Sequence, residues 1–200
     1  MTAMLQYGGG YGLLFFGVLL CALAGGSFVR NEVWRDEVQI WEDVARKSPA
    51  KARGLDFLGA AYLGKADYEK AIEAYLRSAK TDPYYALQSR RNLARIYIDI
   101  GKLDQAIEIT TEAIMVDSRD KDLYMVRGRA RYRKKYFLEA IEDFSRAADI
   151  APLNPDPYAA RGTVYLDQGD EAKALREFDR ACRYGRQDAC DVAREVRDNR

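Results

Sequence analysis

The sequence predicts an all-α protein in which an apolar N-terminal helix precedes an array of helix–turn–helix units. Two observations predict this fold. The first 29 of the 200 residues contain no Asp, Glu, Lys or Arg, whereas charged residues are dense from Arg30 onward. Beyond that boundary small residues recur at intervals of 34, most clearly at Ala106, Ala140 and Ala174. A self-similarity of this length is typical of stacked two-helix repeats.

The composition excludes several classes of function. The chain has no histidine, which rules out Ser-His-Asp and Cys-His catalysis and the common histidine-containing zinc sites. A net charge of +1 argues against a nucleic-acid binder, which usually has a clear basic excess. Adjacent carboxylates such as Glu142 and Asp143 are expected on solvated helix faces, because a helix points neighbouring side chains about 100° apart. We therefore expect no enzyme, no cofactor and no metal site.

The uncharged residues 1–29 are expected to hold a leader and a transmembrane helix. Residues 11–29 would span about 28 Å as a helix, which is close to the hydrocarbon thickness of a bilayer. A cleaved signal peptide is the main alternative, because Ala22, Leu23 and Ala24 fit a small-x-small cleavage pattern. No basic residue precedes the apolar run, however, so we expect an uncleaved, single-pass anchor in a bacterial inner membrane.

Residues 30–50 are expected to form a connecting helix that is a lone second half of a repeat. Its apolar face consists of Trp34, Val38, Trp41 and Val44. This face should pack on the first full unit of the array. At the other end, the polar residues 189–200 are expected to form a capping helix, because the apolar face of the last unit needs a cover.

Four full units are expected over residues 52–188, at 52–85, 87–120, 121–154 and 155–188. Where the two helices of a unit cross, the residues are small: Gly59, Ala94, Gly128 and Gly162. Aromatic residues stand at the matching position of three second helices, with a threonine in the second unit: Tyr75, Thr110, Phe144 and Phe178. Gly101 and Gly169 are expected in the turns between paired helices.

These positions resemble the tetratricopeptide repeat (TPR) family over about two-thirds of the chain. The resemblance implies a right-handed α-solenoid whose first helices line a concave groove that binds a partner protein or peptide. It also implies which side chains face that groove. Transferred to this sequence, the expected partner-binding residues are Phe57, Arg91, Asn92, Arg95, Met125, Arg129, Tyr132 and Arg133.

The middle of this groove is expected to be basic, between two apolar ends. Its arginines would bind a carboxylate or an acidic peptide through bidentate hydrogen bonds, and an ordinary solvated surface is the alternative. The carboxylate clamp known in the family is not expected, because Asp56, Asp122 and Val126 occupy three of its basic positions. The function expected from the sequence is therefore a membrane-anchored scaffold for a protein or peptide partner.

The junction after the apolar region has a second resemblance. RNEVWRDEVQIWEDVARKSPAKAR, residues 30–53, is similar to the start of the tail in multi-spanning proteins related to O-mannosyltransferases, which carry tetratricopeptide repeats there. The resemblance implies, as an alternative function, an accessory tail or subunit of a membrane glycosyltransferase-like system. None of the catalytic portion of such a transferase is present, so no activity carries over.

Cys182 and Cys190 bear on which side of the membrane the repeats lie. In one continuous helix their Cα atoms would be about 12 Å apart, too far for a disulfide, but Gly185 interrupts that helix. Their spacing resembles the disulfide of cysteine-rich secreted relatives of the family, and two reduced core cysteines are the alternative. Because a disulfide needs an oxidising compartment, we expect the repeats to face the periplasm. The basic residues after the apolar region favour the cytoplasmic face instead.

Overall fold

Ten α-helices make up the part of the chain that the computed structural model describes, residues 37–81 and 83–198. They are α2 (Glu37–Lys47), α3 (Ala52–Gly64), α4 (Tyr68–Thr81), α5 (Pro83–Asp99), α6 (Leu103–Val116), α7 (Lys121–Arg133), α8 (Phe137–Ile150), α9 (Asp156–Asp167), α10 (Glu171–Arg183) and α11 (Gln187–Asp198). The expected membrane helix at 11–29, and Trp34, lie outside these residues. Over the described ranges, no helix has the length and apolar character needed to cross a bilayer.

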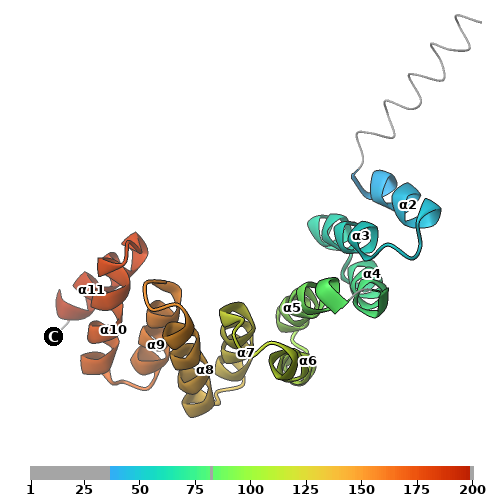
Figure 1. Ribbon diagram of the computed structural model, residues 1–200. Helices are drawn as coiled ribbons and strands as arrows, with labels where there is room; N and C mark the ends of the chain where they lie inside the picture. Colours follow the sequence, from blue (N-terminus) through green and yellow to red (C-terminus); the bar gives the residue numbers. More distant parts are fainter. Residues whose placement is uncertain (1–36, 82, 199–200) are drawn as a thin grey trace, which may run out of the picture.

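The helices form an arc of antiparallel pairs, which confirms the expected all-α solenoid (Figure 1). Each helix packs on the next along the chain, and α5 also contacts both α3 and α7. The first helices of the pairs therefore lie along the inner side of the arc, with the second helices outside them (Figure 1). At the two ends, α2 packs on α3 and α11 packs on α10.

Two helix boundaries differ from the expected units. Helix α5 begins at Pro83, four residues before Leu87, because proline is favoured in the first turn of a helix, where its missing N–H costs no hydrogen bond. Helix α11 begins at Gln187, two residues before the expected start at Ala189. The turn before it is short, because Gly185 adopts a φ of +96° and reverses the chain at once.

The crossing point of each helix pair is fitted by a matched couple of side chains. A Cβ atom added at Gly59 would lie 2.9 Å from the Tyr75 ring, and one added at Gly128 would lie 2.6 Å from the Phe144 ring. The second unit has Ala94 in place of the glycine and Thr110 in place of the ring. The second unit thus combines a larger first residue with a smaller second one at its crossing.

The core consists of clusters that each join neighbouring parts of the array. The alanines that define the repeat, at 71, 106, 140 and 174, are completely buried. Leu55, Leu58 and Tyr75 of the first unit form one cluster with Leu93 and Ile96 of the second, so the units share their apolar core. At the N-terminal end, Val38 is buried and the rings of Trp41 and Phe57 stack with centroids 4.5 Å apart. Helix α2 therefore covers the N-terminal end of the first unit.

The expectation that Glu142 and Asp143 are both solvated is wrong for Asp143. Glu142 is exposed, but the side chain of Asp143 is only 3% exposed and accepts hydrogen bonds from Arg127 at 2.7 Å and Arg131 at 2.8 Å. The reason is the direction of the helix face: position 143 of α8 points at α7, where two arginines one turn apart supply the opposite charge. A buried carboxylate is stable only with such partners.

The fourth unit repeats this tie between helices. Arg161 of α9 donates to Glu177 of α10 at 2.7 Å. Arg127 and Arg161 each also bind a hydroxyl on the second helix of the preceding unit. Arg127 donates to Thr111 at 3.2 Å, and Arg161 donates to Ser145 at 2.8 Å. The second and third joints of the array are therefore crossed by arginine side chains. The matching positions of the first two units carry the buried leucines 58 and 93.

Candidate partner-binding groove

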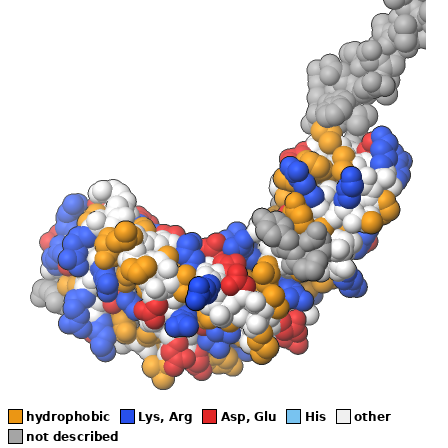
Figure 2. Space-filling model, in the orientation of Figure 1, with side chains coloured by type: hydrophobic (Ala, Val, Ile, Leu, Met, Phe, Trp, Pro, Cys, Tyr) orange, Lys and Arg blue, Asp and Glu red, His pale blue; other side chains and the backbone are white. Residues whose placement is uncertain are grey.

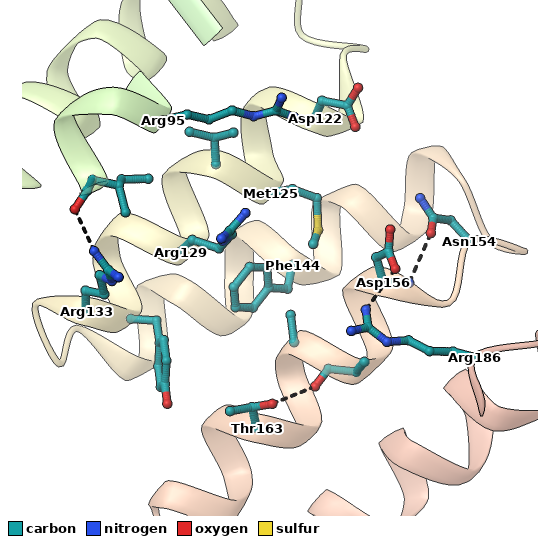
Figure 3. Close-up of a pocket in the computed structure, with 15 residues that line it drawn as sticks. Arg95, Asp122, Met125, Arg129, Arg133, Phe144, Asn154, Asp156, Thr163 and Arg186 are labelled. Carbon is teal, nitrogen blue, oxygen red and sulfur yellow. Dashed lines mark hydrogen bonds and ion pairs between the residues drawn. The ribbon is translucent and has the colours of Figure 1, made fainter. Parts of the chain in front are cut away.

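The inner side of the arc holds a pocket of about 560 Å³ between α5, α7 and α9. Five of the expected partner-binding residues lie around it: Arg95, Met125, Arg129, Tyr132 and Arg133. They come from consecutive first helices, because positions 34 residues apart fall at the same height on neighbouring units. Figure 3 shows Arg129 beside Met125 and Phe144, and Arg95 reaching from α5 toward Asp122.

The other three expected residues lie outside this pocket and have partners within the chain. Phe57 lies at the N-terminal end, between Trp41 and the guanidinium of Arg53, which is 5.7 Å from the ring centroid. Arg91 forms ion pairs with Asp120 and Asp122. Asn92 lies near the hydroxyl of the buried Tyr75, whose pKa it lowers although burial raises that pKa overall. These groups support the solenoid rather than line the pocket.

The floor of the pocket is apolar. It is formed by Val126 and Phe144, which are buried, by Met125, and by Ala159 and Ala160 of α9. The small alanines leave room for a ligand side chain above them. A segment that fills this space would bury apolar groups of its own, which stabilises binding in proportion to the area removed from water.

Two arginines at the rim differ from the rest of the lining in their electrostatic environment. Arg95 and Arg129 are exposed, and neither forms an ion pair with any residue that the structure describes. Arg133 instead donates to the carbonyl oxygen of Ile98 at 2.6 Å, which joins α7 to α5. The Tyr132 hydroxyl donates to Asp167 at 2.5 Å, and this hydrogen bond, together with burial, raises the pKa of Tyr132 to about 12.

The two aspartates in the pocket are paired with cations. Burial raises the pKa of Asp122, but the hydrogen bond and charge of Lys121 and the charges of Arg91 and Arg95 outweigh it, so the pKa is lowered overall. Asp156 binds Arg186 at 2.8 Å. The lining holds Arg95, Arg129, Arg133 and Arg186 against Asp122 and Asp156, which leaves an excess of two positive charges. The pocket can therefore take an anionic segment with apolar side chains.

Sequence reasoning missed the C-terminal wall of the pocket. Asn154 and Asp156 lie at the start of α9, and Arg186 lies in the turn between α10 and α11. The expected groove was restricted to the first helices of the units, and nothing in the spacing of the capping turn indicated that it reaches the inner side of the arc. Figure 3 shows Arg186 directed from that turn at Asp156.

The structure contains a disulfide between Cys182 and Cys190, with the Cα atoms 4.8 Å apart. The turn at Gly185 brings α11 back alongside α10, which removes the separation that a continuous helix would impose. In residues 37–81 and 83–198, no cluster of three or more acidic or cysteine side chains is arranged to hold a metal ion.

The outer surface carries no uniform charge. Figure 2 shows Lys and Arg side chains interspersed with Asp and Glu over the face in view. Exposed ion pairs between acidic and basic residues include Asp170 with Lys173 and Asp179 with Arg197. This face therefore lacks the continuous basic stripe that tracks a nucleic-acid backbone.

Two sequence models match the chain, over residues 91–155 and 52–85, and both describe a tetratricopeptide repeat. Solved structures with the same fold include a thermophilic TPR protein from Thermus thermophilus, with a TM-score of 0.67 and 20% identity over 92% of this chain and 96% of that one. MamA from Desulfovibrio magneticus has a TM-score of 0.67 and 17% identity over 84% of this chain and 94% of that one. YrrB, described as a TPR protein with an unusual peptide-binding site, has a TM-score of 0.63 and 16% identity over 86% of this chain and 88% of that one.

Curated relatives match over shorter parts of their own length. The small glutamine-rich tetratricopeptide repeat-containing protein 2 of Saccharomyces cerevisiae is 32% identical over 118 residues, which are 57% of this chain and 32% of that protein. The ETO1-like protein 2 of Arabidopsis thaliana is 28% identical over 148 residues, 72% of this chain and 15% of that protein. The chain thus spans less than a third of the length of these two relatives.

Proposed function

The chain is a tetratricopeptide repeat protein, a scaffold for protein–protein interaction and not an enzyme, and from this premise we propose that it is membrane-anchored and binds an acidic segment of a partner protein. The binding site in this proposal is the pocket between α5, α7 and α9. One observation carries it: two exposed arginines, Arg95 and Arg129, stand above an apolar floor and form no ion pair with any described residue.

The positions of the two arginines favour an extended ligand with two carboxylates. They lie 34 residues apart, at the same register of neighbouring first helices. Packed helices have axes about 8–10 Å apart, and an extended chain advances about 3.3 Å per residue. Carboxylates two or three residues apart in the partner would therefore reach both guanidinium groups. Each would form the paired, charge-assisted hydrogen bonds that arginine makes with a carboxylate.

The anchor and the periplasmic location are also part of the proposal. The uncharged residues 11–29 are long enough for a membrane span, and the Cys182–Cys190 disulfide favours an oxidising compartment. An accessory role beside a membrane glycosyltransferase rests only on the resemblance of residues 30–53. It would gain support if a multi-spanning transferase were the main protein that purifies with the chain.

Co-purification from detergent-solubilised membranes tests the site. The variant is Arg95→Glu/Arg129→Glu, which reverses the charge of the rim while leaving the floor intact. The control is Arg77→Glu/Arg146→Glu, which makes the same charge change at exposed positions of the second helices α4 and α8. We expect the first variant to lose a partner that the wild type and the control retain. If the partners of all three forms are the same, the basic groove is not the binding site.

A further inference from the structure

The turn that the disulfide closes is also a wall of the groove. Arg186 is the single residue between the turn glycine, Gly185, and the start of α11. Its side chain lines the pocket, whereas neither cysteine does, and the disulfide joins α10 to α11. The disulfide therefore closes the short segment that carries one charge of the groove.

Several contacts fix the backbone of Arg186. The backbone N–H of Arg186 donates to the carbonyl oxygen of Ala181 at 3.1 Å. The carbonyl oxygen of Arg186 lies 3.6 Å from the Cys190 Sγ. Tyr184, two residues earlier, packs its ring on Tyr158 of α9 with centroids 5.4 Å apart. The backbone of Arg186 is thus held on both sides.

The side chain of Arg186 joins the turn to the groove. Its Nη1 donates to Asp156 at 2.8 Å, and its Nε donates to Asp188 at 2.9 Å. Asp156 is the only acidic pocket residue paired with a cation from outside the first helices, within the part of the chain that the structure describes. Without Arg186, an unpaired carboxylate would face the same space as Arg95 and Arg129.

We propose that Arg186 is a specificity-determining residue of the groove: it neutralises Asp156 so that the pocket accepts an acidic segment, and the Cys182–Cys190 disulfide holds it in place. This inference rests on the proposed function and deepens it. It predicts that Arg186 raises the affinity of the groove for acidic ligands and that Asp156 lowers it. A merely structural ion pair would change the stability of α11 and leave the charge preference of the groove unchanged.

Fluorescence anisotropy with two labelled peptides tests the inference on the full chain in detergent. In one peptide glutamate alternates with valine, and in the other glutamine replaces glutamate. For the glutamate peptide, we expect Arg186→Gln to weaken binding about threefold and Asp156→Asn to tighten it about threefold, the range of a partly exposed charge pair. The double variant should return to near the wild-type affinity. The glutamine peptide should bind all four forms equally.

A cysteine variant tests the positioning role of the disulfide. Cys182→Ser/Cys190→Ser should weaken binding of the glutamate peptide, and adding Arg186→Gln to it should weaken binding less than the same change does in the wild type. Circular dichroism checks that the helix content of the whole chain is unchanged. Full additivity would overturn the role of the disulfide.

Two further outcomes would overturn the role of Arg186. One is equal affinity of all forms for the glutamate peptide, and the other is no binding of this peptide by any form. The scaffold function itself is tested by a different experiment, the co-purification with the Arg95→Glu/Arg129→Glu variant.

Discussion

Matched pairs of side chains set the distance between the helices of each unit. Gly128 and Phe144 form one such pair, and Gly162 and Phe178 form another, with the ring lying where the glycine Cβ would be. Protein interiors are close-packed, so an added methyl group at these points must displace the ring or the helix. The small residues were recognisable in the sequence from their spacing alone, but the closeness of the contact was not.

Gly128→Ala is expected to destabilise the protein by about 1–3 kcal/mol, the usual cost of overpacking a core. The added Cβ would lie 2.6 Å from the Phe144 ring. Gly64→Ala is the matched control, because a Cβ there meets nothing within 4 Å, and alanine is the better helix former by up to about 1 kcal/mol. Urea unfolding midpoints measure both. Equal effects of the two changes would contradict the packing argument.

The helices of the C-terminal half are tied by arginines whose partners the sequence did not reveal. Glu142 and Asp143 are adjacent carboxylates, and periodicity alone does not distinguish the exposed one from the buried one. The neighbouring helix distinguishes them, since Arg127 and Arg131 of α7 donate to the side chain of Asp143 and not to that of Glu142. The repeat pattern therefore predicted the elements well, while the polar contacts between them depended on geometry that only the structure supplies.

Asp143→Asn is expected to lower the free energy of unfolding by about 3 kcal/mol, because it leaves two arginines beside a neutral amide in a buried site. Glu142→Gln removes the same charge from the next residue, which is exposed, and should change stability by less than about 0.5 kcal/mol. Thermal unfolding monitored by circular dichroism measures the two variants side by side. A similar loss in both would mean that net charge, and not the buried tie, is responsible.

The 34-residue period predicts the array as a whole but does not extend to its two ends. Alanines at intervals of 34 predicted the solenoid, because each stands at a helix crossing that repeats from unit to unit. Five of the eight groove residues, among them Arg95 and Arg129, come together at one pocket for the same reason. Arg186 escaped prediction, because its place depends on how the chain reverses after the last unit, where the period ends.

Topology is a property of the whole molecule and can be tested with its cysteines. We expect a membrane-impermeant maleimide to label Cys182 and Cys190 in spheroplasts, which lack an outer membrane, only after a reductant is added and without lysis. This result would place the disulfide and the repeats in the periplasm. The Cys182→Ser/Cys190→Ser variant gives the background from Cys21. Labelling that needs lysis but no reductant would instead place the repeats in the cytoplasm.

The arginine ties have a mechanical consequence for the membrane-anchored scaffold that we propose. In a linear array each unit contacts mainly its neighbours, so a pulling force passes through the joints in series. Arg127 and Arg161 span the joints from the second unit to the third and from the third to the fourth, and the pocket lies over these same two joints. Directional, charge-assisted bonds resist sliding at these joints. The joint between the first two units has no such arginine and is held instead by the apolar core that these units share and by the hydrogen bond from Ser89 to Asp56.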